Sequence, residues 1–428
     1  MIPILSSFLM PCLLLFLENS LLKLVLAWLT FWVFSHIYRI NLIKSGRIFI
    51  LLRYRLLSIC IFFFFSKKRL TFYILFEISL LPTLLIVLLY GYQPEKLQAS
   101  LYLLIYTVLR SLPLLLCLLS IPIYLSSLFL IPGIFSGIFL TLGFIVKTPI
   151  YIVHVWLPKA HVEAPVAGRI VLAGVLLKLG SYGLFIFCPL IHHYILLIYL
   201  IISLLGRIIG SYICTRQWDR KRLIAYSSVV HIGVVTIGVV SGSEIGYLCA
   251  LIIVIAHGVC SPIIFAIAYL LYSNSHTRLL SSNRGLLTIP FIRIFLFILL
   301  AINIGVPPFL NLWREVLIFI SLITIFGNSL WLLIPIAFLG VLYNLYIYIS
   351  LRHGKETFHL SFLGLLWPIV SSISLSLLIR GNLSLFYVYF FLSEAISNTA
   401  TMCRLSQIIT EVTGNMCRFL IFLDVLTF

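Results

Sequence analysis

Residues 101–119 read LYLLIYTVLRSLPLLLCLL, an apolar run that holds a single charged residue. The run is apolar on every face of a helix, whereas a strand of a membrane barrel alternates apolar and polar side chains. A hydrocarbon core about 30 Å thick needs roughly 20 helical residues to cross it. The stretch predicts a membrane-spanning helix, and the predicted fold class is an all-α, polytopic transmembrane helical bundle.

The rest of the chain has the same character. Of its 428 residues, 62% are hydrophobic and 9% are charged, with a mean hydropathy of +1.20, far outside the range of soluble domains. Apolar runs of spanning length predict about 13–14 spans. They lie near residues 3–17, 21–38, 47–65, 70–90, 98–120, 128–146, 166–187, 194–214, 223–241, 246–272, 288–304, 310–325, 329–351 and 358–379.

Several classes of function find no support in the sequence. The nine cysteines are single residues in or near apolar runs, without CxxC spacing, and are typical of small core residues rather than of a metal or disulfide set. No glycine-rich turn follows a strand, so no phosphate-binding loop is predicted. We therefore expect no cofactor, no metal and no nucleic acid partner for this chain.

The formal charge of +18 points to membrane lipids as partners, because basic residues next to a span are attracted to acidic headgroups. Basic clusters lie at residues 39–55 and 67–69 and flank a single predicted span on opposite sides. The usual excess of positive charge on one side of the membrane therefore assigns no orientation to the chain.

Two proline-containing breaks divide the chain into similar halves. Lys147-Thr148-Pro149 begins the first break, and Gly305-Val306-Pro307-Pro308 forms the second. Proline removes a backbone donor and interrupts a helix, which is tolerated at membrane depth only beside protein or water. Paired broken helices are typical of transporters with inverted repeats. We predict repeats at residues 46–200 and 201–351, preceded by short helices at 1–45 and followed by a helix and tail at 352–428.

Ionisable residues inside apolar spans are the candidate functional residues. Glu77 lies in the middle of a predicted span and Lys178 lies within another. An ionisable group at the centre of a span costs about 2.5–3.5 kcal/mol, so each is expected to face the protein interior and a partner. A buried lysine can also exchange a proton at neutral pH. The alternative for Glu77 is a structural ion pair, and for Lys178 it is extension of the side chain to the membrane interface.

Four further residues continue this series along the chain: Lys147, His231, His257 and Glu315. Lys147 ends an apolar run, and interfacial extension is a stronger alternative there. Histidine titrates in the range that a proton relay needs, although a lone buried histidine is more often a hydrogen-bonding residue. Six ionisable residues on successive apolar spans are improbable as packing alone, and together they predict a path for protons.

A polar segment follows the first break. His154, His161 and Glu163 resemble metal ligands, but their spread over ten residues with an intervening proline disfavours a preformed site. A proline-containing loop beside a water-accessible cavity is the better interpretation of this segment.

These motifs resemble the subunit 4 family of antiporter-like membrane subunits in mitochondrial NADH:ubiquinone oxidoreductase, respiratory complex I. The most specific signature is HVWLPKAHVEAP at residues 154–165, together with LLKLG at 176–180. Weaker matches are LIAYSS at residues 223–228, IAHG at 255–258 and PPFLNL at 307–312, and the resemblance covers roughly residues 45–350.

The resemblance implies fourteen helices with two inverted five-helix repeats. It implies that Glu77 is the family glutamate and that Lys147 and Lys178 are its two lysines, with His231 and His257 linking Lys178 to the glutamate at position 315. Family members carry no redox centre and translocate protons within the enzyme complex. The implied setting is a multi-pass protein of the mitochondrial inner membrane, in a hetero-oligomer with other membrane-arm subunits.

Two rival functions remain open at this point. A stand-alone cation/proton antiporter would share the repeats and the buried charges, whereas a scaffolding subunit would hold the same charges as static pairs.

A separate hypothesis concerns five arginines at positions where the family usually has glycine or serine: Arg110, Arg169, Arg207, Arg222 and Arg314. No methionine occurs between Met10 and Met402. Animal mitochondrial codes that read AGA and AGG as serine or glycine, and AUA as methionine, would account for both features. The alternative is that the protein has these arginines and extends them to the membrane interface.

Overall fold

A computed structural model describes residues 21–40, 46–91, 93–120, 134–285, 290–307, 309–327 and 333–353. Within these ranges the regular structure is helical, with one isolated β-bridge, which confirms the predicted all-α fold. Eight helices are long and apolar enough to cross a membrane, and three shorter apolar helices accompany them. The predicted spans at residues 3–17 and 358–379 lie outside the described residues.

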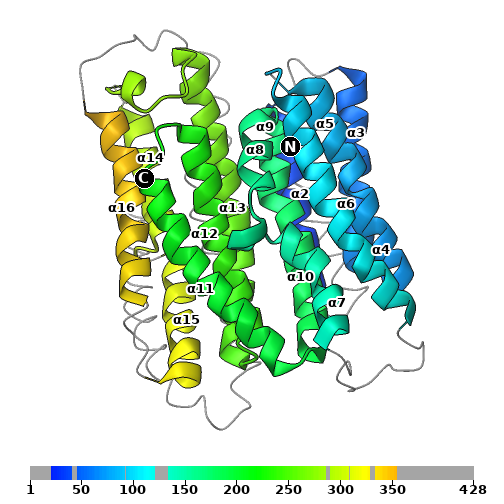
Figure 1. Cartoon of the computed structure of the whole chain (residues 1–428). Helices are drawn as coiled ribbons and strands as arrows, with labels where there is room; N and C mark the ends of the chain where they lie inside the picture. The colour runs from blue at the N-terminus through cyan, green and yellow to red at the C-terminus, as the bar shows by residue number, and fades with distance from the viewer. Residues whose placement is uncertain are drawn as a thin grey trace.

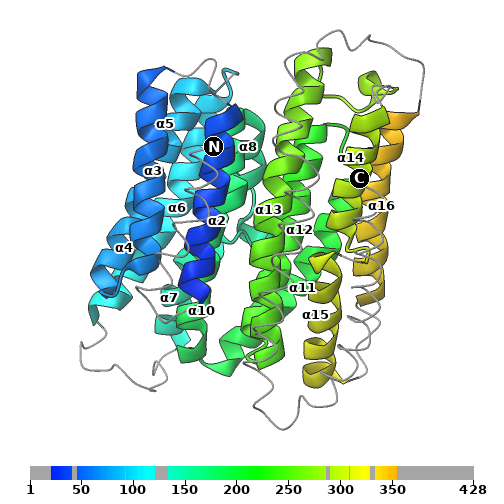
Figure 2. The same cartoon turned by 180° about the vertical axis from the view of Figure 1, so that it is seen from behind.

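The helices form two groups that lie side by side (Figures 1 and 2). The first group contains α3 to α10 and the second contains α11 to α16, while α2 packs against both α3 and α13. The bounds of the first part are α2 Leu21–Ile40, α3 Arg47–Phe65, α4 Arg69–Ile78, α5 Leu80–Tyr90, α6 Lys96–Ser120, α7 Ile134–Lys147, α8 Trp156–Glu163, α9 Val166–Val171 and α10 Leu177–Phe187.

The second part continues from the end of α10. Its helices are α11 His193–Thr215, α12 Arg220–Val240, α13 Glu244–Ser275, α14 Pro290–Ile304, α15 Leu310–Phe326 and α16 Leu333–Arg352. The two groups meet where α8 packs against α12 and where α9 packs against α13. The division between the groups lies close to the predicted repeat boundary at residue 200, and the inverted relation of the two repeats stays a prediction.

Both predicted breaks separate helices. The first separates α7 from α8, with a short 3-10 turn, Tyr151–Val153, between them. The second separates α14 from α15, and Gly305 adopts φ +94° there, a conformation that strongly favours glycine. The side-chain amide of Asn311 then donates to the carbonyl of Ile302 at 2.5 Å and ties the two helix ends together.

Two of the predicted spans contain a break or an irregular turn in the helix. The span at residues 70–90 is divided at Ser79 into α4 and α5, because Pro82 has no N–H and its ring crowds the carbonyl of Ile78. The span at residues 166–187 contains a π-helical turn, Leu172–Leu176, between α9 and α10. Both predicted spans are present, and each contains one local irregularity.

An aromatic cluster fixes the first group of helices. Phe144 of α7 stacks on Phe187 of α10 with ring centroids 5.3 Å apart, and it meets Phe72 and Phe76 of α4 edge-on. A Cβ atom added to Gly183 of α10 would lie 2.2 Å from the Phe144 ring. The absence of a side chain at position 183 therefore permits the close packing of α7 and α10.

We predict that Gly183→Ala destabilises the protein by about 1–3 kcal/mol, because Phe144 is enclosed and cannot move aside. The matched control is Gly340→Ala in α16, where an added Cβ meets no atom within 4 Å. The amount of assembled complex that remains after heating, followed on native gels, measures the difference in stability between the two variants. Equal thermal stability of the two variants would contradict the packing argument.

Candidate functional site

The end of α7 places Lys147 inside the first group of helices. Its side chain is 4% exposed, so it does not extend to the membrane interface. The ammonium donates to the backbone carbonyl of Phe76 at 2.5 Å and lies 3.2 Å from the centroid of the Phe76 ring. The hydroxyl of Ser79 lies 3.5 Å away. The break between α4 and α5 thus presents a carbonyl, a ring and a hydroxyl to one buried cation.

Glu77 is close enough to Lys147 for the two charges to interact, but it forms no direct bond to the ammonium group. Among the described residues, no ion pair within 4.0 Å joins Glu77 and Lys147, although the two charges interact electrostatically. The Oε1 atom of Glu77 is buried without a hydrogen-bond partner. We hypothesise that Glu77 and Lys147 work as a pair of opposite charges that can separate. They form no direct ion pair in this structure, and the hypothesis stays a prediction.

Lys178 lies immediately after the π-helical turn. Its ammonium donates to the carbonyl of Ala173, which belongs to that turn, at 2.5 Å. The same ammonium lies 3.0 Å from Nδ1 of His257 on α13. Single-turn π segments inside α-helices occur frequently at functional sites. The structure therefore joins two of the predicted residues, from separate helices, within hydrogen-bonding distance.

The contacts continue into the second group of helices. The ring centroids of His257 and His231 are 5.8 Å apart, and the hydroxyl of Tyr343 lies 3.2 Å from Nε2 of His231. Nδ1 of His231 lies 2.6 Å from Nη1 of Arg314. Nη2 of Arg314 lies 3.3 Å from Oε1 of Glu315, so a guanidinium separates the histidine from the acid.

A second arginine approaches the same acid. Nη2 of Arg207, on α11, lies 3.6 Å from Oε1 of Glu315. Glu315 itself is 21% exposed, whereas Arg207 and Arg314 are almost completely buried. We define the buried axis as the ionisable side chains that this series of contacts connects: Lys178, His257, His231, Arg314, Arg207 and Glu315.

Several residues of this site were not predicted from the sequence. Tyr343, Asn303 and Asn344 are buried polar residues on α14 and α16, and the two asparagine side chains bond to each other at 2.9 Å. Polar residues are common in helices near span ends. The sequence alone therefore does not show that these three side chains face the buried axis. A search for buried polar groups on the helices that face His231 would have found them.

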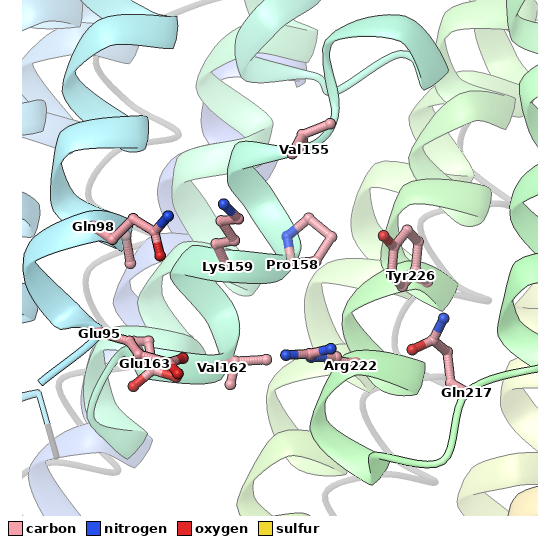
Figure 3. A pocket seen from close by; sticks show the side chains of 11 residues that line it. Glu95, Gln98, Val155, Pro158, Lys159, Val162, Glu163, Gln217, Arg222 and Tyr226 are labelled. Atoms are coloured by element: carbon pink, nitrogen blue, oxygen red, sulfur yellow. The ribbon is translucent and has the colours of Figure 1, made fainter. Parts of the chain in front are cut away.

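The polar segment after the first break lies between the two groups of helices. Val155, Pro158, Lys159, Val162 and Glu163 line a cavity of about 390 Å³, as expected for a segment beside a cavity. Figure 3 shows these side chains together with residues from α6 and α12. His161 belongs to the same helix but stacks on Phe265 of α13, at 4.6 Å between ring centroids.

Residues 66–342 match the family model described as NADH:quinone oxidoreductase/Mrp antiporter, TM. The chain belongs to this family. Two relatives are both named NADH-ubiquinone oxidoreductase chain 4. The one from Albinaria caerulea is 43% identical over 300 residues, which is 67% of this chain and 69% of the relative. The one from Lumbricus terrestris is 38% identical over 362 residues, which is 79% of this chain and 80% of the relative.

Solved structures share the antiporter-family fold. Respiratory complex I from Thermus thermophilus with bound NADH contains a chain that matches with a TM-score of 0.71 and 24% identity, covering 84% of this chain and 80% of that chain. The Mrp complex from Dietzia sp. contains another, with a TM-score of 0.71, 16% identity, and coverage of 78% and 67%. The family fold therefore occurs both in a redox complex and in an antiporter complex.

We predict that Glu77 and Lys147 act as one unit even though they are separated here. Glu77→Gln or Lys147→Met alone should lower proton translocation about 10-fold, and the double variant should be no worse than the Lys147→Met variant, because residues that act together give non-additive losses. Proton uptake by assembled complexes in vesicles measures the rates. Multiplicative losses in the double variant would show that the two residues act independently.

Proposed function

We propose that this chain is a proton-translocating subunit of the membrane arm of respiratory complex I, in the mitochondrial inner membrane. It works as part of the NADH:ubiquinone oxidoreductase enzyme, in a hetero-oligomer with other subunits, and holds no redox centre of its own. The observation that carries the proposal is the Lys178–His257 contact at 3.0 Å, with His231 beside His257 at 5.8 Å between ring centroids.

The geometry supports proton transfer along this axis. Proton transfer requires donor and acceptor within hydrogen-bonding distance, either directly or through water. Lys178 and His257 meet this condition directly. His257 and His231 are neighbours whose ring centroids are 5.8 Å apart, a separation that one water or a ring rotation would bridge. Lys178, His257 and His231 therefore offer a short series of proton-transfer steps inside the bundle.

In this proposal, changes in buried charge couple a movement in the neighbouring subunit to proton transfer in this chain. Lys147 and Glu77 occupy the first group of helices, and each changes the electrostatic environment of the other. Opposite charges that approach stabilise each other's charged forms, and separation removes that stabilisation. A change in the neighbouring subunit that moves Glu77 would change the proton affinity of Lys147, and the changed charge would then act on Lys178.

The two rivals differ from this proposal in testable ways. The likeness to the Mrp complex, at 16% identity, shows a shared fold, whereas the relatives at 38–43% identity are named NADH-ubiquinone oxidoreductase chain 4. Purification of the chain together with flavin and iron–sulfur subunits separates these two cases. A purely scaffolding role predicts that the buried charges can be neutralised without loss of proton translocation.

We predict that Lys178→Met abolishes proton translocation in the assembled complex, because methionine fills the same space without a transferable proton. Electron transfer from NADH to an artificial acceptor, which bypasses the membrane arm, should stay unchanged. The matched control is Lys68→Met, at an exposed position before α4 whose side chain makes no helix-capping bond.

Proton uptake by vesicles that contain the complex, normalised to its amount on native gels, measures the outcome. A loss of at least about 100-fold is expected for a group that transfers the proton directly. Normal translocation by the Lys178→Met complex would reject the proposed role and favour the scaffolding subunit.

A further inference from the structure

The cavity between the two groups of helices is lined by polar side chains that are not part of the buried axis. It lies between the start of α6, the α8 helix and the start of α12, as Figure 3 shows. Its walls carry Glu95, Lys159, Arg222 and Tyr226, and its volume of about 390 Å³ is enough for several water molecules. Water in this cavity would reach the wall formed by α8.

Glu163 forms part of that wall. Its side chain is 3% exposed and its carboxylate faces Arg278, which lies after α13 in the second group of helices, with Oε1 and Nη1 3.5 Å apart. Neither carboxylate oxygen makes a hydrogen bond. A buried carboxylate with unused acceptor atoms is costly unless water or a proton satisfies it. The cavity beside it can supply both.

His161 lies on the inner side of the same helix. It is fully buried, neither ring nitrogen has a hydrogen-bond partner, and it interacts electrostatically with Lys178. Residues two positions apart on a helix do not face each other, so a proton that moves from Glu163 to His161 requires water at the end of α8. That helix ends at Glu163, where Pro165 prevents its continuation and leaves carbonyl groups for water.

We propose that Glu163 exchanges protons between cavity water and the buried axis, with Arg278 as its counter-ion and His161 as the next group toward Lys178. This inference rests on the proposed function and adds an access point to it. The carboxylate accepts a proton from cavity water, and the O–H bond then breaks as the proton moves through water to a nitrogen of His161. No oxidant or reductant takes part in these steps.

The first test is Glu163→Gln in the assembled complex. We expect proton translocation per complex to fall at least about 10-fold, because glutamine keeps the shape but cannot exchange a proton. Glu163→Asp should recover part of the rate. The matched control is Glu244→Gln, which changes an exposed acid in the first turn of α13 that does not line the cavity, and it should have no effect.

The outcomes separate this inference from the proposed function. Translocation at the normal rate in Glu163→Gln, with translocation lost in Lys178→Met, would overturn the access point and leave the proposed function intact. A purely structural role of the Glu163–Arg278 pair predicts less assembled complex but a normal rate per complex, and that result would also overturn the inference.

Accessibility is tested on its own by Glu163→Cys and a charged, membrane-impermeant thiol reagent. We expect labelling from one side of the membrane only, because the cavity lies at one end of the bundle. Labelling is compared with that of the unmodified chain, in which the described native cysteines are buried. Absence of labelling from both sides would overturn the inference.

A different observation carries a second inference, about the arginines of the buried interior. Arg169, Arg207 and Arg314 are 1%, 4% and 1% exposed. Arg207 and Arg314 both approach Oε1 of Glu315, so one carboxylate faces two guanidiniums. The Nε atoms of Arg207 and Arg314 and Nη1 of Arg207 have no hydrogen-bond partner. An unbalanced buried charge of this kind is strongly destabilising.

We infer that positions 207 and 314 carry serine or glycine in the protein made in the mitochondrion; Arg169 donates to the carbonyl of Val162 and is not included. Reading of AGA and AGG as serine or glycine accounts for these arginines, and reading of AUA as methionine accounts for the absence of methionine between residues 10 and 402. Arg110 and Arg222 are not fully buried, and burial gives no argument for them. A small residue at 314 would leave space for water between His231 and Glu315.

Peptide mass spectrometry of the chain from purified complex tests this inference. We expect the mass of serine or glycine at positions 207 and 314, with no tryptic cleavage after them. Arg278 is the matched control, because its guanidinium pairs with Glu163, and it should appear as arginine with cleavage after it. Arginine masses at positions 207 and 314 would overturn the inference.

Discussion

Every feature of this bundle depends on the cost of a charge or an unpaired backbone group away from water. The helices satisfy their own backbone groups, so the interior can accept only those charges for which the protein provides a partner. The contact between Lys178 and His257 is the central case, because it brings a cation on α10 to a ring nitrogen on α13 at 3.0 Å. The positions of α10 and α13 follow from the requirement that the buried cation has a partner.

The irregular points of the helices coincide with the buried cations. The division of α4 from α5 leaves the carbonyl of Phe76 to accept from Lys147, and the π-helical turn places the carbonyl of Ala173 beside Lys178. A regular helix uses its carbonyl groups internally, so a buried ammonium group finds few acceptors beside one. The breaks therefore have a chemical role, since they supply acceptors where the cations lie.

The junction between the two groups of helices joins packing to chemistry. Helix α8 packs against α12, and the cavity beside it brings water close to a carboxylate that pairs with Arg278 from the second group. This junction thus brings together the cavity, the carboxylate of Glu163 with its partner Arg278, and the helix that carries His161. Motion between the groups would change all three together, which is the property that a coupled proton path requires.

The sequence by itself determined the all-helical membrane fold, both proline-containing breaks and the identity of the ionisable residues on the spans. It could do so because the bilayer imposes span length and apolar composition locally, within about 20 residues. Only the tertiary structure decided the partners. Lys147 bonds to Phe76, 71 positions earlier, rather than to Glu77, and Lys178 meets His257, 79 positions later. Periodicity within one span carries no information about which other span faces it, so contacts of this length appear only when the helices are packed.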